Sequence, residues 1–173
     1  GNTLKALSRL DEAEASYNQA IALKPDFAVA HNNLGSTLKA LGRLDEAEAS
    51  YNQAIALKPD FAIAHNNLGS TLKALGRLDE ALASYNQAIA LKPDYAVAHS
   101  NLGNVLRELG RADEAEASYN QAIALKPDYA EAHRYLTLVK TYEVQDEQYS
   151  KMEDLYLDEN LSEEQRCHIN FGL

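Results

Sequence analysis

The chain has 173 residues, of which 46% are hydrophobic, and a formal net charge of −10 at pH 7. This acidic balance provides no strongly positive field for phosphate backbones, so we expect no nucleic-acid partner. No apolar run approaches the roughly 18 residues of a membrane-spanning helix, so we expect no membrane partner either. Cys167 is the only cysteine, which excludes an internal disulfide and favours a reducing compartment such as the cytoplasm.

Internal repetition is the clearest feature of the sequence. The ten residues Tyr-Asn-Gln-Ala-Ile-Ala-Leu-Lys-Pro-Asp occur four times unchanged, and they start at Tyr17, Tyr51, Tyr85 and Tyr119. Each start lies 34 residues after the last. A fixed period of about 20 to 50 residues is typical of repeats that stack and bury each other's apolar faces. The sequence therefore predicts one continuous stack without a central core.

The first predicted element is a partial repeat over residues 1–27. Gly1 stands at the eighth place of the repeat unit, so only Gly1 to Leu7 remain of the unit's first helix. A helix of this length is marginal in water. We expect the remnant to fray, or to bury Leu4 and Leu7 against another molecule, because an uncapped repeat exposes its stacking face.

Three complete repeats follow. They span residues 28–61, 62–95 and 96–129. The first helix of each repeat is predicted from leucines at the spacing of one helix face, namely Leu34, Leu38 and Leu41 in the first complete repeat. Asp26 is the candidate N-cap of that helix, and Gly42 suits the left-handed position just beyond its end.

The second helix of each complete repeat is predicted to begin at acidic residues. In the first complete repeat, Asp45 and Glu48 have the spacing of a capping box, and Pro59 ends the helix. The short connection makes the two helices an antiparallel hairpin. Gly35 inside the first helix costs about 1 kcal/mol relative to alanine. We expect close approach of the second helix, with Tyr51 filling the space, to offset that cost.

After residue 129 the repeat diverges. A helix is predicted from Ala130, where Thr137 later replaces the repeat glycine. Residues 141–173 form an acidic tail with 9 Asp and Glu against 2 Lys and Arg, and we expect it to be helical. His168 and Gly172 reproduce the spacing of a first helix, so the tail is expected to end as a further repeat begins.

The pattern resembles the tetratricopeptide repeat. That family places small residues eighth, twentieth and twenty-seventh in the unit, an aromatic residue twenty-fourth and a proline thirty-second. These places are held by Gly35, Ala47, Ala54, Tyr51 and Pro59, then by Gly69, Ala81, Ala88, Tyr85 and Pro93, and then by Gly103, Ala115, Ala122, Tyr119 and Pro127. The resemblance implies an all-α fold, a right-handed α-solenoid of antiparallel helix pairs, over residues 1–140.

The acidic tail has a resemblance of its own. In composition it is similar to the segment that follows tetratricopeptide arrays in some bacterial proteins whose C-terminal domain is sulfotransferase-like. The likeness covers about 30 residues and carries no catalytic residue onto this chain.

One face of the first helix repeats a pattern of apolar and polar residues. We predict that this face binds the partner, since the resemblance places it in the concave groove of the array. Its members are Val29, Asn32, Asn33, Ser36 and Lys39, then Ile63, Asn66, Asn67, Ser70 and Lys73, and then Val97, Ser100, Asn101, Asn104 and Arg107. Helix layers roughly 10 Å apart match about three residues of an extended peptide.

Asparagine forms a row along this face. Asn33, Asn67 and Asn101 resemble the asparagine ladder of the O-linked N-acetylglucosamine transferase family, and Tyr135 interrupts the row. An amide side chain is both donor and acceptor, so a column of amides suits pairing with the backbone of a guest chain. The alternative interpretation is a solvated face that duplication copied with everything else.

Lys39, Lys73 and Arg107 form a second, basic row that suits acidic side chains or a carboxylate. The tetratricopeptide arrays that clamp a terminal carboxylate use a lysine at the fifth place of the unit. That place is held here by Asn32, Asn66 and Ser100. The resemblance therefore argues against that particular activity.

No motif for catalysis or for cofactor binding is found. His31, His65, His99 and His133 recur once per repeat, and helices 8 to 10 Å apart place them too far from one another to share a metal ion. We expect packed imidazoles there, no metal, no cofactor and no enzyme activity in this chain.

These observations predict a protein-interaction scaffold that binds an extended protein or peptide segment in its groove. A first alternative is the substrate-recruiting arm of a larger transferase, sulfotransferase-like or glycosyltransferase-like. A second is a self-assembly module whose terminal repeats stack end to end.

Overall fold

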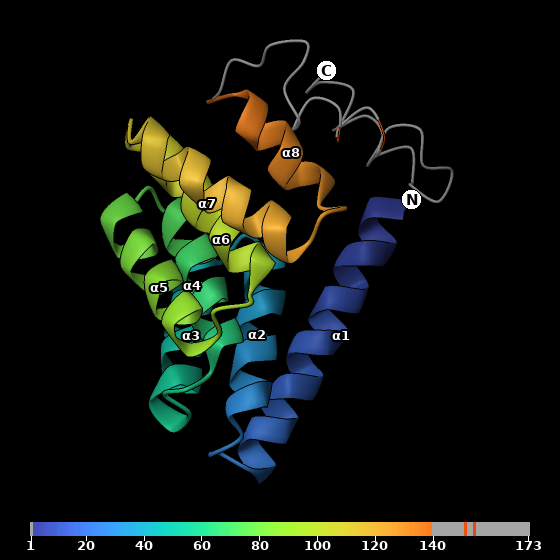
Figure 1. The fold of residues 1–173 in the computed structure, drawn as a ribbon. Coiled ribbons are helices and arrows are strands. Elements are labelled where there is room, and N and C mark those ends of the chain that lie inside the picture. Colours follow the sequence, from blue (N-terminus) through green and yellow to red (C-terminus); the bar gives the residue numbers. More distant parts are fainter. Residues whose placement is uncertain (1, 140–150, 152–153, 155–173) are drawn as a thin grey trace. The chain divides into compact units, whose positions relative to one another are not determined.

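The computed structural model describes residues 2–139, 151 and 154, and all regular structure in this part is α-helical, as the sequence predicts. The helices are α1 (Asn2–Leu23), α2 (Ala28–Ala40), α3 (Leu44–Leu57), α4 (Ala62–Ala74), α5 (Leu78–Leu91), α6 (Ala96–Glu108), α7 (Ala112–Leu125) and α8 (Ala130–Thr137) (Figure 1). The chain divides into two compact units, Gly1–Pro93 with α1 to α5 and Asp94–Leu173 with α6 to α8. Apart from residues 151 and 154, the predicted tail helices and further repeat at 141–173 lie outside the described residues.

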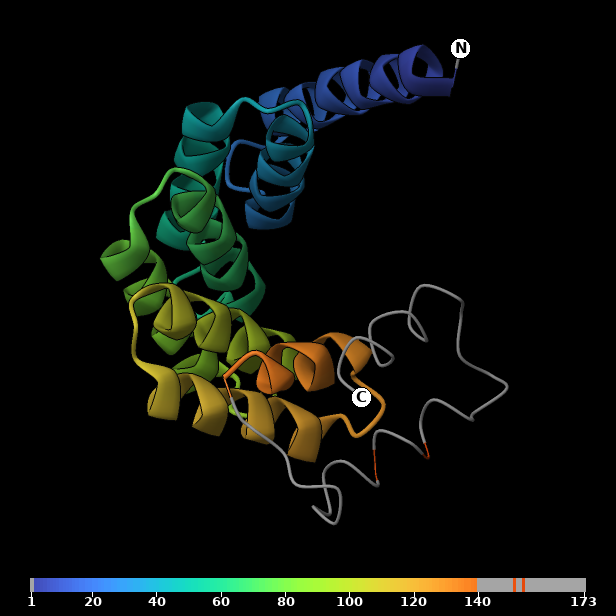
Figure 2. The same cartoon turned by 90° about the horizontal axis from the view of Figure 1, so that it is seen from above.

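Unit 1 (Gly1–Pro93) is a series of helices in which each packs against the next, from α1 to α5. Figure 2 shows the turns that reverse the chain between them. Helices α2 and α4, the first helices of consecutive repeats, also contact each other. The pairs α2–α3 and α4–α5 are therefore the helix hairpins that the sequence predicts.

A glycine and a tyrosine set the spacing inside each hairpin. A Cβ atom added to Gly35 of α2 would lie 2.8 Å from Cε1 of Tyr51 on α3, and one on Gly69 would lie 2.9 Å from Cε1 of Tyr85. Both tyrosines are 1% exposed. The predicted close approach is confirmed, because a side chain at either glycine would collide with a buried ring.

The turn between α2 and α3 depends on a glycine in the left-handed region. Gly42 has a φ of +78°, which is unfavourable for residues with a Cβ. The Arg43 N–H donates to the Leu38 carbonyl at 2.9 Å, and the Gly42 N–H donates to the Lys39 carbonyl at 3.0 Å. These two bonds are those of the Schellman motif, which ends a helix and reverses the chain.

The start of the chain departs from this pattern. Ser8 stands where the later repeats have Gly42, Gly76 and Gly110, and the chain continues through it as one helix, α1. Serine enters the left-handed region at a cost that glycine does not have, so the turn is replaced by continued helix. The expectation of a separate short helix at Gly1 to Leu7 is therefore wrong.

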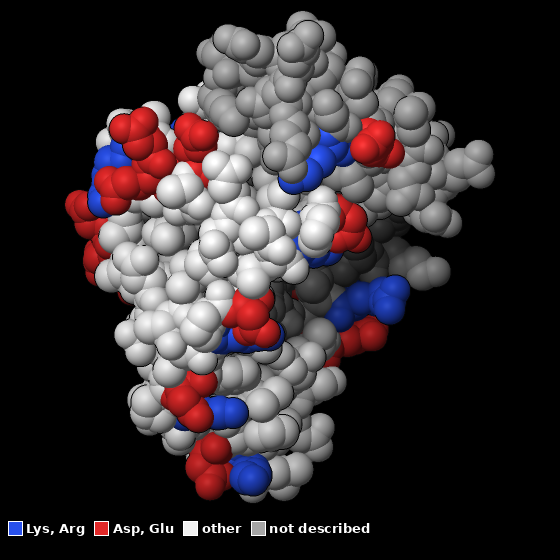
Figure 3. All heavy atoms as spheres, in the orientation of Figure 1, with Lys and Arg blue, Asp and Glu red and all other residues white. Residues whose placement is uncertain are grey.

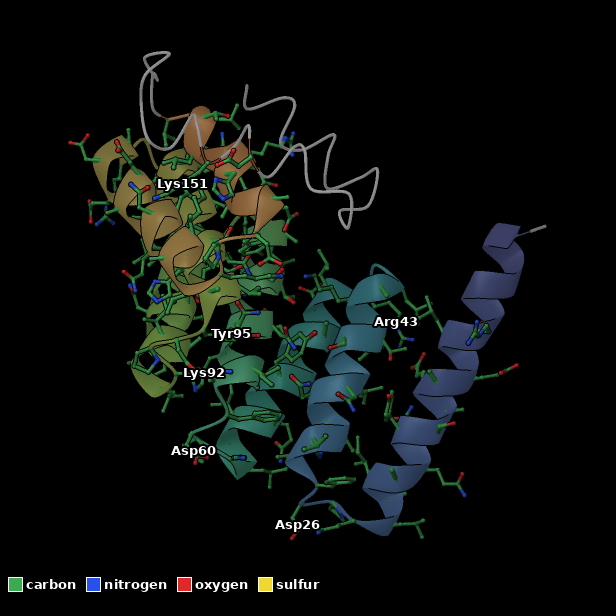
Figure 4. The ribbon with its side chains drawn as sticks, turned by 45° about the vertical axis from the view of Figure 1, so that its right-hand side comes forward. Asp26, Arg43, Asp60, Lys92, Tyr95 and Lys151 are labelled. Carbon is green, nitrogen blue, oxygen red and sulfur yellow. The ribbon has the colours of Figure 1, made fainter. Side chains whose placement is uncertain are left out.

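Asp26 is not the N-cap of α2. Phe27 occupies the N-cap position and the helix has no side-chain cap. The main chain makes the turn instead, because the Ala28 N–H donates to the Asp26 carbonyl at 3.1 Å. Figure 4 shows Asp26 and Asp60 at the equivalent turns before α2 and α4, and both side chains are exposed.

The capping box predicted from Asp45 and Glu48 is also wrong. Helix α3 begins one residue earlier, and the turn places Arg43 at its N-cap position without a side-chain cap. Asp45 then lies in the first turn, where its negative charge is stabilised by the positive end of the helix dipole. Glu48 faces another helix and forms an ion pair with Arg77.

Unit 2 (Asp94–Leu173) repeats the hairpin as α6–α7, and α8 packs against both helices. A Cβ on Gly103 of α6 would lie 2.6 Å from Cε1 of Tyr119 on α7, so the same close approach holds here. Gly110 takes the left-handed turn with a φ of +74°. Helix α8 has 8 residues where α6 has 13, and it ends at Thr137, the residue at the place of the repeat glycine.

Candidate functional site

The exposed side of α2 and α4 in unit 1 carries most of the residues that the sequence singles out. We call it the α2–α4 face. Its members are Val29, Asn33, Ser36 and Lys39 of α2 and Ile63, Asn67, Ser70 and Lys73 of α4. Steps of three and four residues place each set on one side of its helix. Val29 is 43% exposed and Ile63 is 46% exposed, so the face presents apolar side chains beside polar ones.

Four asparagine side chains cross this region as a continuous chain of hydrogen bonds. Asn66 Nδ2 donates to Asn67 Oδ1 at 3.4 Å, and Asn67 Nδ2 donates to Asn32 Oδ1 at 3.1 Å. Asn32 Nδ2 then donates to Asn33 Oδ1 at 3.2 Å. The bond from Asn67 to Asn32 joins α4 to α2. The chain of amides therefore fixes the two helices and the orientation of their side chains.

The two halves of each asparagine pair have different roles. Asn32 and Asn66 are only 5% exposed, whereas Asn33 and Asn67 are partly exposed. An amide side chain has two N–H donors and two acceptor lone pairs. Asn67 uses one of each in the chain of amides. The buried pair therefore orients the exposed pair, which keeps capacity for further hydrogen bonds.

Hydroxyl groups connect the rest of the α2–α4 face. The Tyr51 hydroxyl donates to Ser36 Oγ at 3.1 Å, and Ser36 Oγ donates to the Asn32 carbonyl at 3.2 Å. The Lys39 ammonium donates to Ser70 Oγ on the neighbouring helix. Partial burial lowers the pKa of Lys39 from its ordinary value. The lysine on α2 is thus already engaged by a polar group of α4.

The corresponding side of unit 2 has a different composition. We call it the α6–α8 face. Its members are Val97, Asn101, Asn104 and Arg107 of α6, together with Glu131, Arg134, Tyr135 and Leu138 on or directly after α8. Val97 is 38% exposed and Leu138 is 56% exposed, but Asn104 is only 9% exposed. Asn104 therefore supports the face more than it forms its surface.

Aromatic rings and arginines dominate this second face. The Tyr119 hydroxyl donates to Asn104 Oδ1 at 2.9 Å, and the nearby Arg107 side chain favours ionisation of that hydroxyl. Burial raises the pKa of Tyr119 to about 12. The Tyr135 ring stacks on Tyr119 with ring centroids 5.9 Å apart, and the Arg134 guanidinium lies 5.4 Å from the Tyr135 centroid.

The repeat histidines tie each first helix to the turn before it. His133 Nε2 lies 2.8 Å from the Pro127 carbonyl oxygen, and His31 and His65 make the same contact with their own prolines at 3.0 and 3.1 Å. Burial lowers the pKa of the His133 imidazole. The neutral ring donates its Nε2–H to the carbonyl. These three histidines therefore have a structural position, as the sequence predicts.

Metal-binding and membrane-spanning features are both absent from the described residues. In that part of the chain, no group of three or more His, Cys, Asp or Glu side chains is placed to hold a metal ion. No helix described there is both long and apolar enough to cross a membrane.

Ion pairs between arginine and glutamate link the second helices, and the sequence analysis missed them. Arg43 at the start of α3 pairs with Glu14 of α1 at 2.6 Å, and Arg77 at the start of α5 pairs with Glu48 of α3 at 2.6 Å. Figure 4 shows Arg43 beside α1, and Figure 3 shows acidic and basic side chains next to each other on the described surface. Hydrogen bonds to Glu46 and then Glu14 raise the pKa of Arg43, and those to Glu80 and then Glu48 raise the pKa of Arg77. The signal was the recurrence of glutamate 29 residues before arginine.

Comparisons with known proteins agree with this architecture. The sequence profile described as TPR repeat matches residues 1–42, 35–76, 69–110 and 103–139. The crystal structure of TTC0263, a thermophilic TPR protein of Thermus thermophilus, has 26% identity and a TM-score of 0.75 over 99% of this chain and 94% of that one. A MamA crystal structure has 23% identity and a TM-score of 0.71 over 99% and 90% of the two chains.

A third solved structure was determined with a peptide. It is the first TPR of Spaghetti (RPAP3) bound to the HSP90 peptide SRMEEVD, with 26% identity and a TM-score of 0.64 over 65% of this chain and 89% of that one. A search of curated proteins finds no significant match.

The profile matches overlap and together span residues 1–139. Within them lie the hairpins, the glycine–tyrosine contacts and the left-handed turns described above. The chain therefore belongs to the tetratricopeptide repeat (TPR) family.

Proposed function

We propose that this chain is a protein-interaction scaffold that holds an extended segment of another protein on the exposed faces of its first helices, without catalysis of its own. On this proposal unit 1 binds through the α2–α4 face and unit 2 binds through the α6–α8 face. Each supplies apolar contact and hydrogen bonds. The partner is a protein or peptide.

The observation that carries this proposal is the composition of the α2–α4 face. Val29 and Ile63 are large apolar side chains that remain 43% and 46% exposed. They stand at the same place on two helices in contact, one turn before Asn33 and Asn67. An extended guest chain offers side chains for the apolar contacts and backbone N–H and C=O groups for the amides.

A structural relative supports a peptide as the partner. The RPAP3 domain, which shares 26% identity with this chain, is bound to a peptide of HSP90. Asn33, Asn67 and Asn101 remain our proposed contacts with the guest backbone, with Ser36 and Ser70 beside them. Asn32, Asn66 and Asn104 are buried, and we assign them a positioning role.

The two alternatives from the sequence, a recruiting arm of a transferase and end-to-end assembly, gain no support from the described residues. The sequence that follows Leu173 in the gene tests the first of them. Light scattering over a range of concentrations tests the second, since a constant mass of 19.1 kDa contradicts self-association.

The test of the proposed function uses peptides selected on the intact chain from a random dodecapeptide library. Binding is then measured by fluorescence anisotropy with a Val29→Asp and Ile63→Asp double variant. A charge at each exposed apolar position opposes burial under a guest, so we expect affinity to fall by about tenfold or more. Both side chains are exposed, so we expect the helix content by circular dichroism to be unchanged.

The matched control is the Asn52→Asp and Asn86→Asp double variant on α3 and α5. These residues are exposed at one equivalent place on the second helices, and the variant adds the same two charges away from the α2–α4 face. It should bind as the unchanged chain does. Equal loss in both variants, or no loss in either, contradicts the proposed location of the site.

A further inference from the structure

Arg107 lacks the polar partner that the repeat supplies elsewhere. At the same place on α2, Lys39 donates to Ser70 Oγ of the next repeat. The residue that corresponds to Ser70 in the last repeat is Leu138, which has no hydroxyl and is 56% exposed. In unit 1 the serine hydroxyl accepts a hydrogen bond from the lysine. In unit 2 leucine holds the place of that serine, so Arg107 has no equivalent acceptor there.

The Arg107 guanidinium also has no counter-ion among the described residues. Arg43, Arg77 and Arg111 each pair with a glutamate at 2.6 Å. Arg107 pairs with no carboxylate within the part of the chain that the structure describes, and its Nε is buried with no acceptor there. A buried N–H without an acceptor is destabilising. A carboxylate supplied by a partner would give the charged guanidinium a counter-ion at its exposed side.

An aromatic surface lies beside the same arginine. The charge of Arg107 acts on the Tyr119 hydroxyl, whose pKa it lowers against the larger effect of burial. The Tyr135 ring stacks on Tyr119 at 5.9 Å with an angle of 25° between the planes. The Arg134 guanidinium lies over the Tyr135 ring at 5.4 Å, a cation–π distance. The two rings thus lie beside two positive groups, Arg107 next to Tyr119 and Arg134 over Tyr135. Arg134 also forms no ion pair among the described residues.

Two glutamates on the same helices limit where an anion can bind. Glu131 lies one turn before Tyr135, near the start of α8, and accepts a hydrogen bond from the Tyr129 hydroxyl at 3.4 Å. Glu108 follows Arg107, and its charge raises the pKa of Tyr119 as a minor cause after burial. The positive part of the face is therefore the part formed by Arg107, Tyr135 and Arg134.

We propose that the α6–α8 face binds the side-chain carboxylate of an Asp or Glu in an extended peptide segment, with Arg107 as its hydrogen-bond donor and Tyr135 as the surface beneath it. The guanidinium presents its N–H donors as a planar fork that matches a carboxylate, and such pairs are charge-assisted. Arg107 is partly exposed, so an anion on the face can reach its side chain. This inference rests on the proposed function, because the carboxylate belongs to a bound peptide.

The experiment compares two synthetic decapeptides that are acetylated and amidated, so neither has a terminal carboxylate. One carries glutamate at every third position and the other carries glutamine at the same positions. Affinities are measured by fluorescence anisotropy at low and high salt for the unchanged chain, for Arg107→Gln, for Lys39→Gln and for Lys126→Gln. Lys126 is exposed at the end of α7 and belongs to neither face, so its variant is the control for the loss of one positive charge. The Lys39 variant removes a charge from the same repeat place in unit 1.

We expect the glutamate peptide to bind the unchanged chain on the order of tenfold tighter than its glutamine twin at low salt. Arg107→Gln should remove this preference, and Lys126→Gln should leave it in place. The double variant Arg107→Lys with Leu138→Ser, which restores the pair found in unit 1, should also reduce the preference.

Three outcomes overturn the inference. Equal binding of both peptides to the unchanged chain removes the acidic preference and leaves the proposed function intact. A preference that survives Arg107→Gln but is lost in Lys39→Gln moves the anion site to unit 1. Binding of neither peptide, in an assay where the selected dodecapeptides also fail, overturns the proposed function together with this inference.

Discussion

The α2–α4 face and the α6–α8 face occupy the same place in the repeat, but their polar side chains have different hydrogen-bond partners. On the first, the polar side chains pair with one another, through the amide chain from Asn66 to Asn33 and through Lys39 with Ser70. On the second, Tyr135 replaces an asparagine and stacks on Tyr119, and Arg107 keeps a buried Nε without an acceptor among the described residues.

This difference shows how a repeat fold separates stability from recognition. The buried part of each hairpin is nearly the same in both units, because Gly69 with Tyr85 and Gly103 with Tyr119 make one kind of contact. The exposed part varies without disturbing it. The exchanges include Asn66 for Arg134, Asn67 for Tyr135 and Ser70 for Leu138. They replace polar side chains that hydrogen-bond one another with an arginine, an aromatic ring and an apolar residue.

The largest expected effect tests whether the buried parts are equivalent. Tyr51→Ala and Tyr119→Ala each remove a ring that is 1% or less exposed, and each should lower the free energy of unfolding by about 3 to 5 kcal/mol. Urea denaturation followed by circular dichroism measures both. If one variant loses less than about 1 kcal/mol, its ring is not a core residue and the two hairpins are not alike.

The contact between Gly35 and Tyr51 could be predicted from the sequence because the fixed period placed a small residue opposite a large one in every repeat. The same reasoning failed at Ser8, where one substitution in the turn changed the whole first helix. It also failed for Glu14 and Arg43, since their ion pair joins two helices and depends on the packing angle.

The sequence predicted which helix face carries the candidate site, but not the contacts among its side chains. The sequence put Asn33 and Asn67 on one face, but a column of identical residues does not reveal that Asn67 bonds Asn32 across the helices. In unit 2, Tyr135 was recognised only as an interruption of the row. Its stacking on Tyr119 could not be predicted from the sequence, because ring orientation depends on how α7 and α8 cross.

A smaller effect tests how closely each hairpin is packed. An added Cβ would lie 2.9 Å from the Tyr85 ring in Gly69→Ala and 2.6 Å from the Tyr119 ring in Gly103→Ala. Overpacking of this kind costs about 1 to 3 kcal/mol. We expect Gly103→Ala to lose more, because the Tyr119 ring is also held by Asn104 and Tyr135 and cannot easily move aside.

The control for these two variants is Gly76→Ala. Gly76 has a φ of +77° and no atom within 4 Å of an added Cβ, so this variant reports only the left-handed backbone cost of about 1 to 2 kcal/mol. Thermal or urea unfolding compares all three variants. If Gly69→Ala and Gly103→Ala are both less destabilising than Gly76→Ala, the rings yield and the close approach does not determine the spacing.

The smallest expected effect concerns the two phenol groups. Tyr119→Phe leaves the amide oxygen of Asn104, which is 9% exposed, without its donor, and should cost about 1 to 3 kcal/mol. Tyr51→Phe loses a bond to Ser36, an exposed hydroxyl that water can satisfy, and should cost under about 1 kcal/mol. Urea denaturation at neutral pH measures the difference. Equal losses would place the two hydroxyls in equivalent environments and remove this distinction between the faces.

Alkaline titration gives an independent reading of the same hydroxyl. Burial raises the pKa of Tyr119 to about 12 from an ordinary value of 10.0. Because the neutral phenol is favoured in the folded chain, its contribution to stability is complete below pH 10 and is lost as the pH rises towards 12. Tyrosinate absorbance should therefore show one residue fewer in the latest part of the titration for Tyr119→Phe than for the unchanged chain. If the missing residue instead belongs to the part near pH 10, the Tyr119 hydroxyl is solvated, and neither its bond to Asn104 nor its contact with Arg107 holds the α6–α8 face in place.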